Sequence, residues 1–498
     1  MKYNCMLLLI IGALSCNTTK KTTDTDDGKI ELVIVQVNDV YEIAPVSGGD
    51  YGGMARIASL KKEQLRLNPN TFLLMAGDFL SPSVYNSLRY EGKRIRGKQM
   101  VEAMNAAGFD LVGFGNHEFD IQKWELQERL DESSFQWIAS NSYLRSNDSL
   151  LPFYKNTAHG KDTLPAYRII SIRDKDGTSL KVGFIGINIP SNMADYVAYS
   201  DPLQTAIRLY SRIKDSCDIV IPITHQTFKQ DSVLASAIPG LPIIIGGHEH
   251  DMRFKKIGNV FITKANANAR TAFVIKIAYD KNRKAVSVQP RLRSLDNTVP
   301  LDSFTSAVVT SWATIAKKNY QTLGFDPMQI ILEKGDSLDG REINTRRSST
   351  NLTRLIVDAM AAACPQAQVA LLNAGSIRLD DVLYPPISQY DILRSLPFGG
   401  SIREVDMKGS LLKQILAAGT GNIGTGGYLQ HNFGAQVVDT SRIYRVALTD
   451  YLLTGAESNL GFLQIRNPLI SNIYPEEPSS KDPRSDVRLA VVRYLRKD

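Results

Sequence analysis

The chain has 498 residues, of which 43% are hydrophobic and 22% are charged, so it is long enough for more than one domain with a full core. The formal net charge of +7 comes from lysines and arginines spread along the whole chain. Because these cations form no basic stripe interleaved with aromatic residues, the sequence argues against nucleic acid as a partner.

The N-terminus has the pattern of an export signal. A lysine precedes the apolar segment Met6–Leu14, which is too short to span a bilayer. Residues Ala13 to Cys16 resemble a bacterial lipobox, although Ala13 stands where leucine is usual. We therefore expect a signal peptide at residues 1–16 with lipidation at Cys16, a polar tether at 17–29, and an exported lipoprotein of the cell envelope. The alternative is cleavage by an ordinary signal peptidase without a lipid.

Residues 30–295 alternate short apolar runs with helical patterns, which predicts a mixed α/β domain. Apolar runs of this length, bounded by glycine or polar residues, are typical of buried strands. The predicted strands are Leu32–Val37, Thr71–Ala76, Leu111–Phe114, Ile219–Ile223 and Leu241–Ile245, with a hairpin at Thr271–Pro290. The predicted helices are Met54–Leu67, Lys98–Ala107 and Pro202–Ile213.

Residues 296–327 are predicted to be a linker that contains an amphipathic helix at Ser303–Lys318. A second domain is expected at residues 328–498. Its predicted elements are a buried strand at Val369–Leu372 and helices at Asn351–Ala363, Gly409–Ala418 and Asp486–Leu495, the last with Ser485 as its N-cap.

Candidate metal ligands follow the predicted strands of the first domain. They are Asp39, Asp78, Asn116, His225, His248 and His250. In open α/β sheets, ligands bind beyond the carboxyl ends of the strands, where these side chains would meet. Each motif alone is usually a turn or a polar loop. Their repetition at successive strand ends favours a two-metal site for phosphate ester hydrolysis, because carboxylates, amides and imidazoles are donors that such metals accept.

Together with Gly52–Arg56 and Asn373–Arg378, these motifs resemble the metallophosphoesterases. The chain from Leu32 to Leu463 resembles the bacterial 5′-nucleotidase and UDP-sugar hydrolase family. The resemblance implies an α/β (α+β) fold, in which a four-layer αββα sandwich is followed by a smaller α/β C-terminal domain. It also implies two divalent or mixed-valence metal ions, of zinc, manganese or iron.

The same resemblance implies how the metals are held, with Asp78 as the bridge. The other ligands would be Asp39, position 41 and His250 for one ion, and Asn116, His225 and His248 for the other. Position 41 departs from the family pattern, because histidine is usual there and this chain has Tyr41. Tyr41 is either a tyrosinate ligand, which would favour iron(III), or a neutral phenol packed nearby.

His117 and Asp120 resemble the catalytic pair of the family. A histidine beside the metals can bond a phosphate oxygen or assist the leaving oxygen, and a carboxylate three residues later can orient its ring. The alternative is that Asp120 only caps a helix that begins near Ile121.

In the second domain, the resemblance assigns substrate binding to Arg346, Asn373, Gly375 and Arg378. Arginines at such positions can grip a phosphate or a carboxylate with a planar fork.

The aromatic residues that stack the nucleobase in the family are missing here. Ile402 and Asn459 stand in their places. Tyr428, Tyr451 and Phe462 are candidates to replace them.

The sequence therefore predicts an exported, metal-dependent phosphoric ester hydrolase that uses a metal-bound hydroxide and acts on a 5′-nucleotide. One alternative is the same site acting on a nucleotide sugar, a cyclic nucleotide or another phosphomonoester. A second is a non-catalytic surface-binding protein. Apart from the small-molecule phosphate ester and the membrane that holds the lipid anchor, no partner is expected, neither nucleic acid nor protein.

Overall fold

The computed structural model describes residues 26–497 except 147–148, 193, 422–428, 435, 476–478 and 480. The predicted signal peptide with Cys16 and most of the polar tether lie outside the described residues, and so does Tyr428. In the part of the chain that is described, no helix combines the length and the apolar character needed to cross a membrane.

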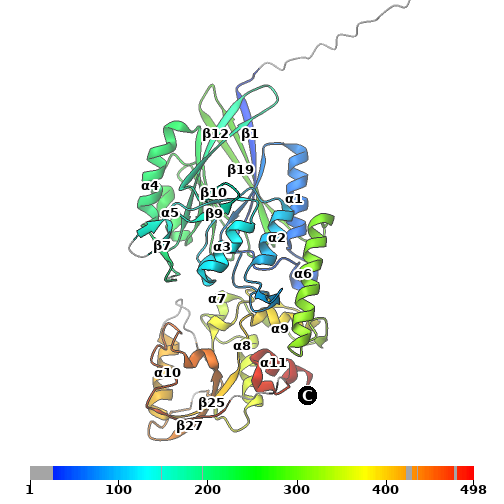
Figure 1. Cartoon of the computed structure of the whole chain (residues 1–498), viewed down its shortest axis with the longest axis vertical. Helices are drawn as coiled ribbons and strands as arrows, with labels where there is room; N and C mark the ends of the chain where they lie inside the picture. The colour runs from blue at the N-terminus through cyan, green and yellow to red at the C-terminus, as the bar shows by residue number, and fades with distance from the viewer. Residues whose placement is uncertain are drawn as a thin grey trace, which may run out of the picture.

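Two six-stranded sheets form the centre of the first domain (Figure 1). The first sheet has the order β19-β18-β1-β2-β5-β6, and the second has the order β11-β12-β14-β15-β17-β16. The strands of the first are β1 (Lys29–Val37), β2 (Thr71–Ala76), β5 (Leu111–Gly113), β6 (Gln136–Ile138), β18 (Thr271–Asp280) and β19 (Ala285–Ser294). Those of the second are β11 (Tyr167–Arg173), β12 (Ser179–Asn188), β14 (Ile219–His225), β15 (Ile243–Gly247), β16 (Arg253–Ile257) and β17 (Val260–Lys264).

In the first sheet β1, β2, β5 and β6 run parallel, and β18 and β19 add an antiparallel hairpin on one side. In the second sheet β12, β14, β15 and β17 run parallel, and β11 and β16 are antiparallel at the two edges. In β1, Leu32 and Ile34 pack between the two sheets, whereas Val33 and Val35 pack under the helices. Since successive side chains of a strand point to opposite faces, a continuous apolar run marks a strand that is covered on both sides.

Helices cover both outer faces of the sheet pair. The first sheet is covered by α1 (Met54–Leu67), α2 (Lys98–Ala107) and α3 (Lys123–Glu132), and the second by α4 (Pro202–Ile213) and α5 (Phe228–Ala237). The four layers confirm the predicted αββα sandwich, and α1, α2 and α4 have their predicted bounds.

Helix α6 (Ser303–Thr322) follows the sandwich and is one turn longer than predicted. The side chain of Asp302 caps it by accepting the N–H of Thr305 at 3.0 Å. The helix packs along α1 and α2, where Nε1 of Trp312 donates to Oε2 of Glu102 at 2.9 Å, and it continues toward the second domain (Figure 1). The linker helix is therefore part of the helical face of the first domain.

The second domain is built on a five-stranded sheet with the order β26-β22-β27-β25-β28. Its strands are β22 (Val369–Asn373), β25 (Ile402–Lys408), β26 (Leu429–His431), β27 (Ile443–Thr449) and β28 (Ile470–Ile473). Helices α8 (Asn351–Ala363) and α11 (Val487–Arg496) cover one face, and α10 (Gly409–Gly421) covers the other. This arrangement confirms the expected smaller α/β domain.

The N-terminus of α11 differs from the prediction. Asp486, and not Ser485, is the N-cap, because its Oδ1 accepts the backbone N–H of Arg488 at 2.9 Å. The same carboxylate binds the guanidinium of Arg488, so it is fixed by two interactions that a serine could not make together.

Candidate active site

The carboxyl ends of the parallel strands of both sheets point toward the second domain (Figure 1). Asp39, Asp78 and Asn116 follow β1, β2 and β5 of the first sheet. His225 ends β14, and the segment from His248 to His250 follows β15 of the second sheet. All the predicted metal ligands therefore lie at one edge of the sandwich, as the strand pattern indicated.

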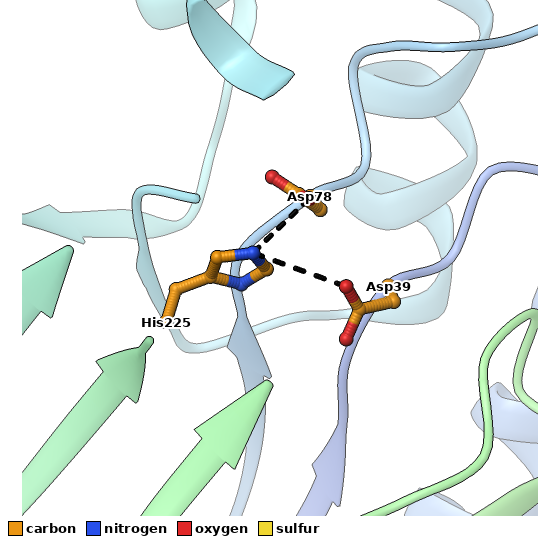
Figure 2. Close-up of side chains that lie close together, drawn as sticks. All are labelled: Asp39, Asp78 and His225. Atoms are coloured by element: carbon orange, nitrogen blue, oxygen red, sulfur yellow. Dashed lines mark ion pairs between the residues drawn. The ribbon is translucent and has the colours of Figure 1, made fainter. Parts of the chain in front are cut away.

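Asp39, Asp78 and His225 form a buried cluster, in which each residue offers a ligand atom within 4.8 Å of the others. Nε2 of His225 lies 3.0 Å from Oδ2 of Asp78 and 3.9 Å from Oδ1 of Asp39 (Figure 2). Asp39 and Asp78 have φ values of 53° and 56°, a region that non-glycine residues seldom adopt. The strand exits thus turn sharply and aim both carboxylates at the same imidazole.

A backbone hydrogen bond fixes the orientation of the His225 ring. Its Nδ1–H donates to the backbone carbonyl of Ala76 at 2.8 Å, which leaves Nε2 toward the carboxylates. Burial lowers the pKa of His225, but Asp78 and Asp39 outweigh burial and raise it to about 9. Negative charge strong enough to hold a proton on Nε2 would also attract a cation to this place.

Buried oxygen atoms at the cluster are available as metal ligands. Oδ1 of Asp39 and Oδ1 of Asn116 are buried without a hydrogen-bond partner among the described residues. Buried polar atoms are nearly always paired, so two such oxygen atoms need a further partner. The residues therefore fit the divalent metals that the sequence predicted.

His248 stands beside the cluster without entering it. Its backbone N–H donates to Oδ2 of Asp39 at 2.9 Å, and its ring contacts the ring of His225 with centroids 5.3 Å apart. Burial, followed by the charge of His225, lowers the pKa of His248 to about 3. The imidazole is therefore neutral, which is the form that can bind a metal.

Tyr41 and His250 lie on the other side of the cluster. The Tyr41 hydroxyl is 2.9 Å from Nε2 of His250 and 3.4 Å from Oδ2 of Asp78. Burial raises the pKa of Tyr41 well above its usual value, and Asp78 and Asp39 raise it further. The Tyr41 hydroxyl thus lies among the predicted ligands.

His117 and Asp120 form a pair, with Nδ1 of His117 2.7 Å from Oδ2 of Asp120. Asp120 also accepts from Ser81 and Asn192, at 2.9 and 2.8 Å. Burial lowers the pKa of His117, but Asp120 and Asp78 outweigh burial, so that the pKa is raised. The imidazole is therefore well placed to give a proton or a hydrogen bond through Nε2.

The alternative role of Asp120 as a helix cap is wrong. Helix α3 begins at Lys123 and is capped by Gln122 in a capping box with Glu125. Asp120 lies in a separate short 3₁₀ turn, His117–Asp120, and is held by the contacts described above.

Glu118 is a residue of the site that the sequence reasoning missed. Its fully buried carboxylate accepts the backbone N–H groups of Asp78, Phe79, Leu80 and Gly115, at 2.6 to 3.1 Å. It thus joins the loop that carries Asp78 to the loop that carries Asn116. Its position between His117 and Asp120 was the only signal in the sequence.

The predicted substrate-binding residues line a cleft of about 1150 Å³ between the two domains. The first domain contributes Asn116, His117 and Asp120, and the second contributes Arg346, Asn373, Gly375 and Arg378. Asn373 donates to Glu457 at 2.6 Å, and Arg346 pairs with Glu342 at 3.0 Å. Two guanidinium groups therefore face the same cleft as the His117–Asp120 pair.

Among the described residues, two aromatic side chains line this cleft, and neither stands at a position expected from the family. Ile402 is buried in β25 and is not part of the cleft wall. Tyr451 and Phe398 are part of it, with 43% and 55% of their surfaces exposed. Of the candidate replacements, Tyr451 is thus in place, whereas Phe462 packs against the core of the second domain.

Comparisons with known proteins agree with this architecture. Residues 32–252 match the family model of the calcineurin-like phosphoesterases, and residues 333–438 match that of the 5′-nucleotidase C-terminal domain. A human 5′-nucleotidase is 24% identical over 523 residues, which cover 89% of this chain and 86% of the human protein.

Solved structures share the fold over nearly the whole chain. The 5′-nucleotidase precursor of Thermus thermophilus has a TM-score of 0.72 and 21% identity, covering 94% of this chain and 96% of its own. The sulfate thiohydrolase SoxB of the same organism has a TM-score of 0.65 and 14% identity, covering 94% of each chain. One fold thus carries sites of different specificity, so substrate has to be argued from the residues of the cleft.

Proposed function

Because the chain belongs to the 5′-nucleotidase family, with a calcineurin-like metallophosphoesterase domain before a 5′-nucleotidase C-terminal domain, we propose that it releases phosphate from 5′-nucleotides. One observation carries the proposal. A single cleft is lined by the His117–Asp120 pair of one domain and by the arginines of the other, and the backbone N–H of His117 donates to Oδ1 of Asp78 in the buried cluster, at 2.8 Å.

The predicted ligands Asp39, Asp78, Asn116, His225, His248 and His250 would hold two metal ions, with the Tyr41 hydroxyl beside them. When bound, such ions make a nucleophile available near neutral pH and offset the charge of the phosphate.

His117 would act on the oxygen atoms of the ester. Its Nδ1 is taken by Asp120, so Nε2 is the atom that can meet the substrate. Donation from Nε2 stabilises the charge that develops on a phosphate oxygen or on the leaving oxygen. Asp120 stabilises the charged imidazole before that proton is given.

The second domain would bind the nucleoside part. Phe398 and Tyr451 offer exposed rings on which a base can stack, and such stacking contributes about 1–3 kcal/mol per base in single-stranded nucleic acids. Arg346 and Arg378 offer planar donors for a phosphate. Nε of Arg346 is buried without a hydrogen-bond partner among the described residues, so it is a donor that an anionic ligand could use.

A substrate panel tests the proposal. The metal-loaded protein would be given a nucleoside monophosphate, a nucleotide sugar, a cyclic nucleotide and glycerol phosphate. The products would be separated and quantified by chromatography, because hydrolysis of a nucleotide sugar or a cyclic nucleotide releases no free phosphate. We expect the highest kcat/KM for the nucleoside monophosphate. A higher value for any other ester would refute the proposed substrate class and leave the hydrolase assignment standing.

We further propose that the protein is exported and held at the cell envelope through a lipid on Cys16. The apolar segment Met6–Leu14 and the lipobox-like residues before Cys16 support this proposal. The wild-type protein should incorporate labelled palmitate and sediment with membranes, and Cys16→Ser should do neither. Equal labelling of both proteins would refute lipidation at this cysteine.

A further inference from the structure

A carboxylate of the second domain reaches the predicted metal site of the first. Oδ2 of Asp380 lies 2.7 Å from Nδ1 of His250. Its other oxygen, Oδ1, accepts the backbone N–H of Glu342 at 2.7 Å. Asp380 has a φ of 43°, which is uncommon outside glycine and persists only where the surroundings require it.

The neighbouring residue, Asp381, is bound by side chains of both domains. Asp381 accepts from Ser47 at 3.0 Å and pairs with Arg270 at 2.5 Å, both in the first domain. It also pairs with Arg394 of its own domain at 3.1 Å. The backbone of residues 380–381 is thus held in place across the interface, and Asp380 is presented to His250 by a fixed support.

The contact constrains what His250 can do. Nδ1 faces a carboxylate, which can only accept, so the other nitrogen is turned toward the cluster. Nε2 lies 3.6 Å from Oδ1 of Asp39 and 2.9 Å from the Tyr41 hydroxyl. Metal-binding histidines typically donate their second ring N–H to a carboxylate, which fixes the ring and makes the ligating nitrogen more basic.

We propose that Asp380 is a positioning residue for His250, so that the metal site of the first domain is completed by the second domain. The proposal rests on the proposed dimetal site, but not on its substrate. One consequence follows from linkage: if the docked second domain strengthens metal binding, the metal strengthens docking by the same factor. A metal site shared in this way responds to the arrangement of the domains even when no substrate is present.

The test measures metal affinity and not turnover. Binding of Mn(II) to the full-length protein would be measured by calorimetry for the wild type, Asp380→Ala and Asp380→Asn, with circular dichroism to confirm that each variant is folded. Asp380→Ala should weaken binding by about 10- to 100-fold, as loss of such outer partners does. Asp380→Asn, which keeps the shape but is a weaker acceptor, should lie between the two.

Two controls separate positioning from general docking. Tyr390→Phe removes a hydrogen bond to Glu42 across the same interface, 2.8 Å long, without touching His250. Because the two sites share no partner, this variant should change Mn(II) affinity by less than about threefold. In a His250→Ala background, Asp380→Ala should cause no further loss.

Wild-type affinity in Asp380→Ala would overturn the proposal, as would equal losses in Asp380→Ala and Tyr390→Phe. A full additional loss in the His250→Ala background would also overturn it. Failure of nucleotide hydrolysis in the substrate panel leaves these binding results unaffected, so the two proposals can fail separately.

Discussion

Lys264 supports the loops of the predicted histidine ligands, and Lys264→Met tests that support. Its side chain is fully buried at the end of β17. Nζ lies 2.8 Å from Oδ2 of Asp231 in α5 and 2.5 Å from Oε2 of Glu249, the residue between the two histidines of the second-sheet loop. Nζ also donates to the carbonyl groups of Gln226 and Gly247, at 2.5 and 2.8 Å.

The size of the effect follows from burial. Methionine keeps most of the stem but removes the charge, and loss of one partner from a buried ion pair costs about 3–5 kcal/mol. Asp231 is fully buried and would keep a hydrogen bond from Nε2 of Gln226 at 3.0 Å, which does not replace an ammonium group. For comparison, Lys93 pairs with Glu128 at the surface, and Lys93→Met should cost less than about 1 kcal/mol.

The cost should also depend on pH. Burial raises the pKa of Asp231, and Lys264 opposes that rise. Without Lys264 the pKa of Asp231 in the folded protein rises further above its unfolded value. The stability that this carboxyl contributes is therefore greatest at low pH and is lost as the pH rises. The destabilisation by Lys264→Met should therefore be larger at about pH 8 than at about pH 5.

Urea unfolding followed by tryptophan fluorescence measures this cost. The three tryptophans, Trp124, Trp137 and Trp312, lie in the first domain and in α6, so the signal reports on the relevant part of the molecule. A chelator in all samples removes any contribution from metal binding. A cost equal to that of Lys93→Met, or a cost that does not change with pH, would contradict the reasoning.

Three further predictions concern the cleft and its supports. Glu118→Gln replaces one carboxylate oxygen by an amide group, which leaves backbone N–H groups such as those of Asp78 and Gly115 without an acceptor, at a cost of about 1–3 kcal/mol each. The variant should therefore show a lower free energy of unfolding in urea and a lower metal content. Normal values for both would count against a supporting role of Glu118. His117→Ala should retain both metals by elemental analysis while kcat falls about 10²- to 10⁴-fold, and unchanged turnover with full metal content would remove His117 from the mechanism. Tyr451→Ala should raise KM for a nucleoside monophosphate about tenfold and leave KM for glycerol phosphate unchanged, whereas an equal rise for both would exclude base stacking.

Local sequence patterns were sufficient for the limits of α1 and α2 and for the buried strands, but not for the N-cap of α11 or the end of α6. The break at Gly52 and Gly53 and the stop at Gly108 bound α1 and α2, and both helices have the predicted limits. The apolar runs before Asp39 and His225 form buried strands of two different sheets, and their parallel direction brings both residues to one edge.

Contacts between distant segments could not be read in this way. Asp380 meets His250 across 130 positions of sequence, and only the docking of the two domains joins them. Lys264 resembles any lysine at the end of a strand until the loops around it are in place. Asp120 precedes a helix in the sequence, as a cap would, but its partners Ser81 and Asn192 come from other segments. Tyr451 reaches the cleft although no family motif marks it.

Every step of the proposed reaction requires two metal ions at the strand ends around Asp78. Anomalous diffraction from crystals of the Mn(II)-loaded protein measures this directly. The expected result is two peaks within bonding distance of the Asp78 carboxylate, one of them also within bonding distance of Nε2 of His225. Crystals of an active, Mn(II)-loaded protein without a peak between Asp78 and His225 would contradict the claim.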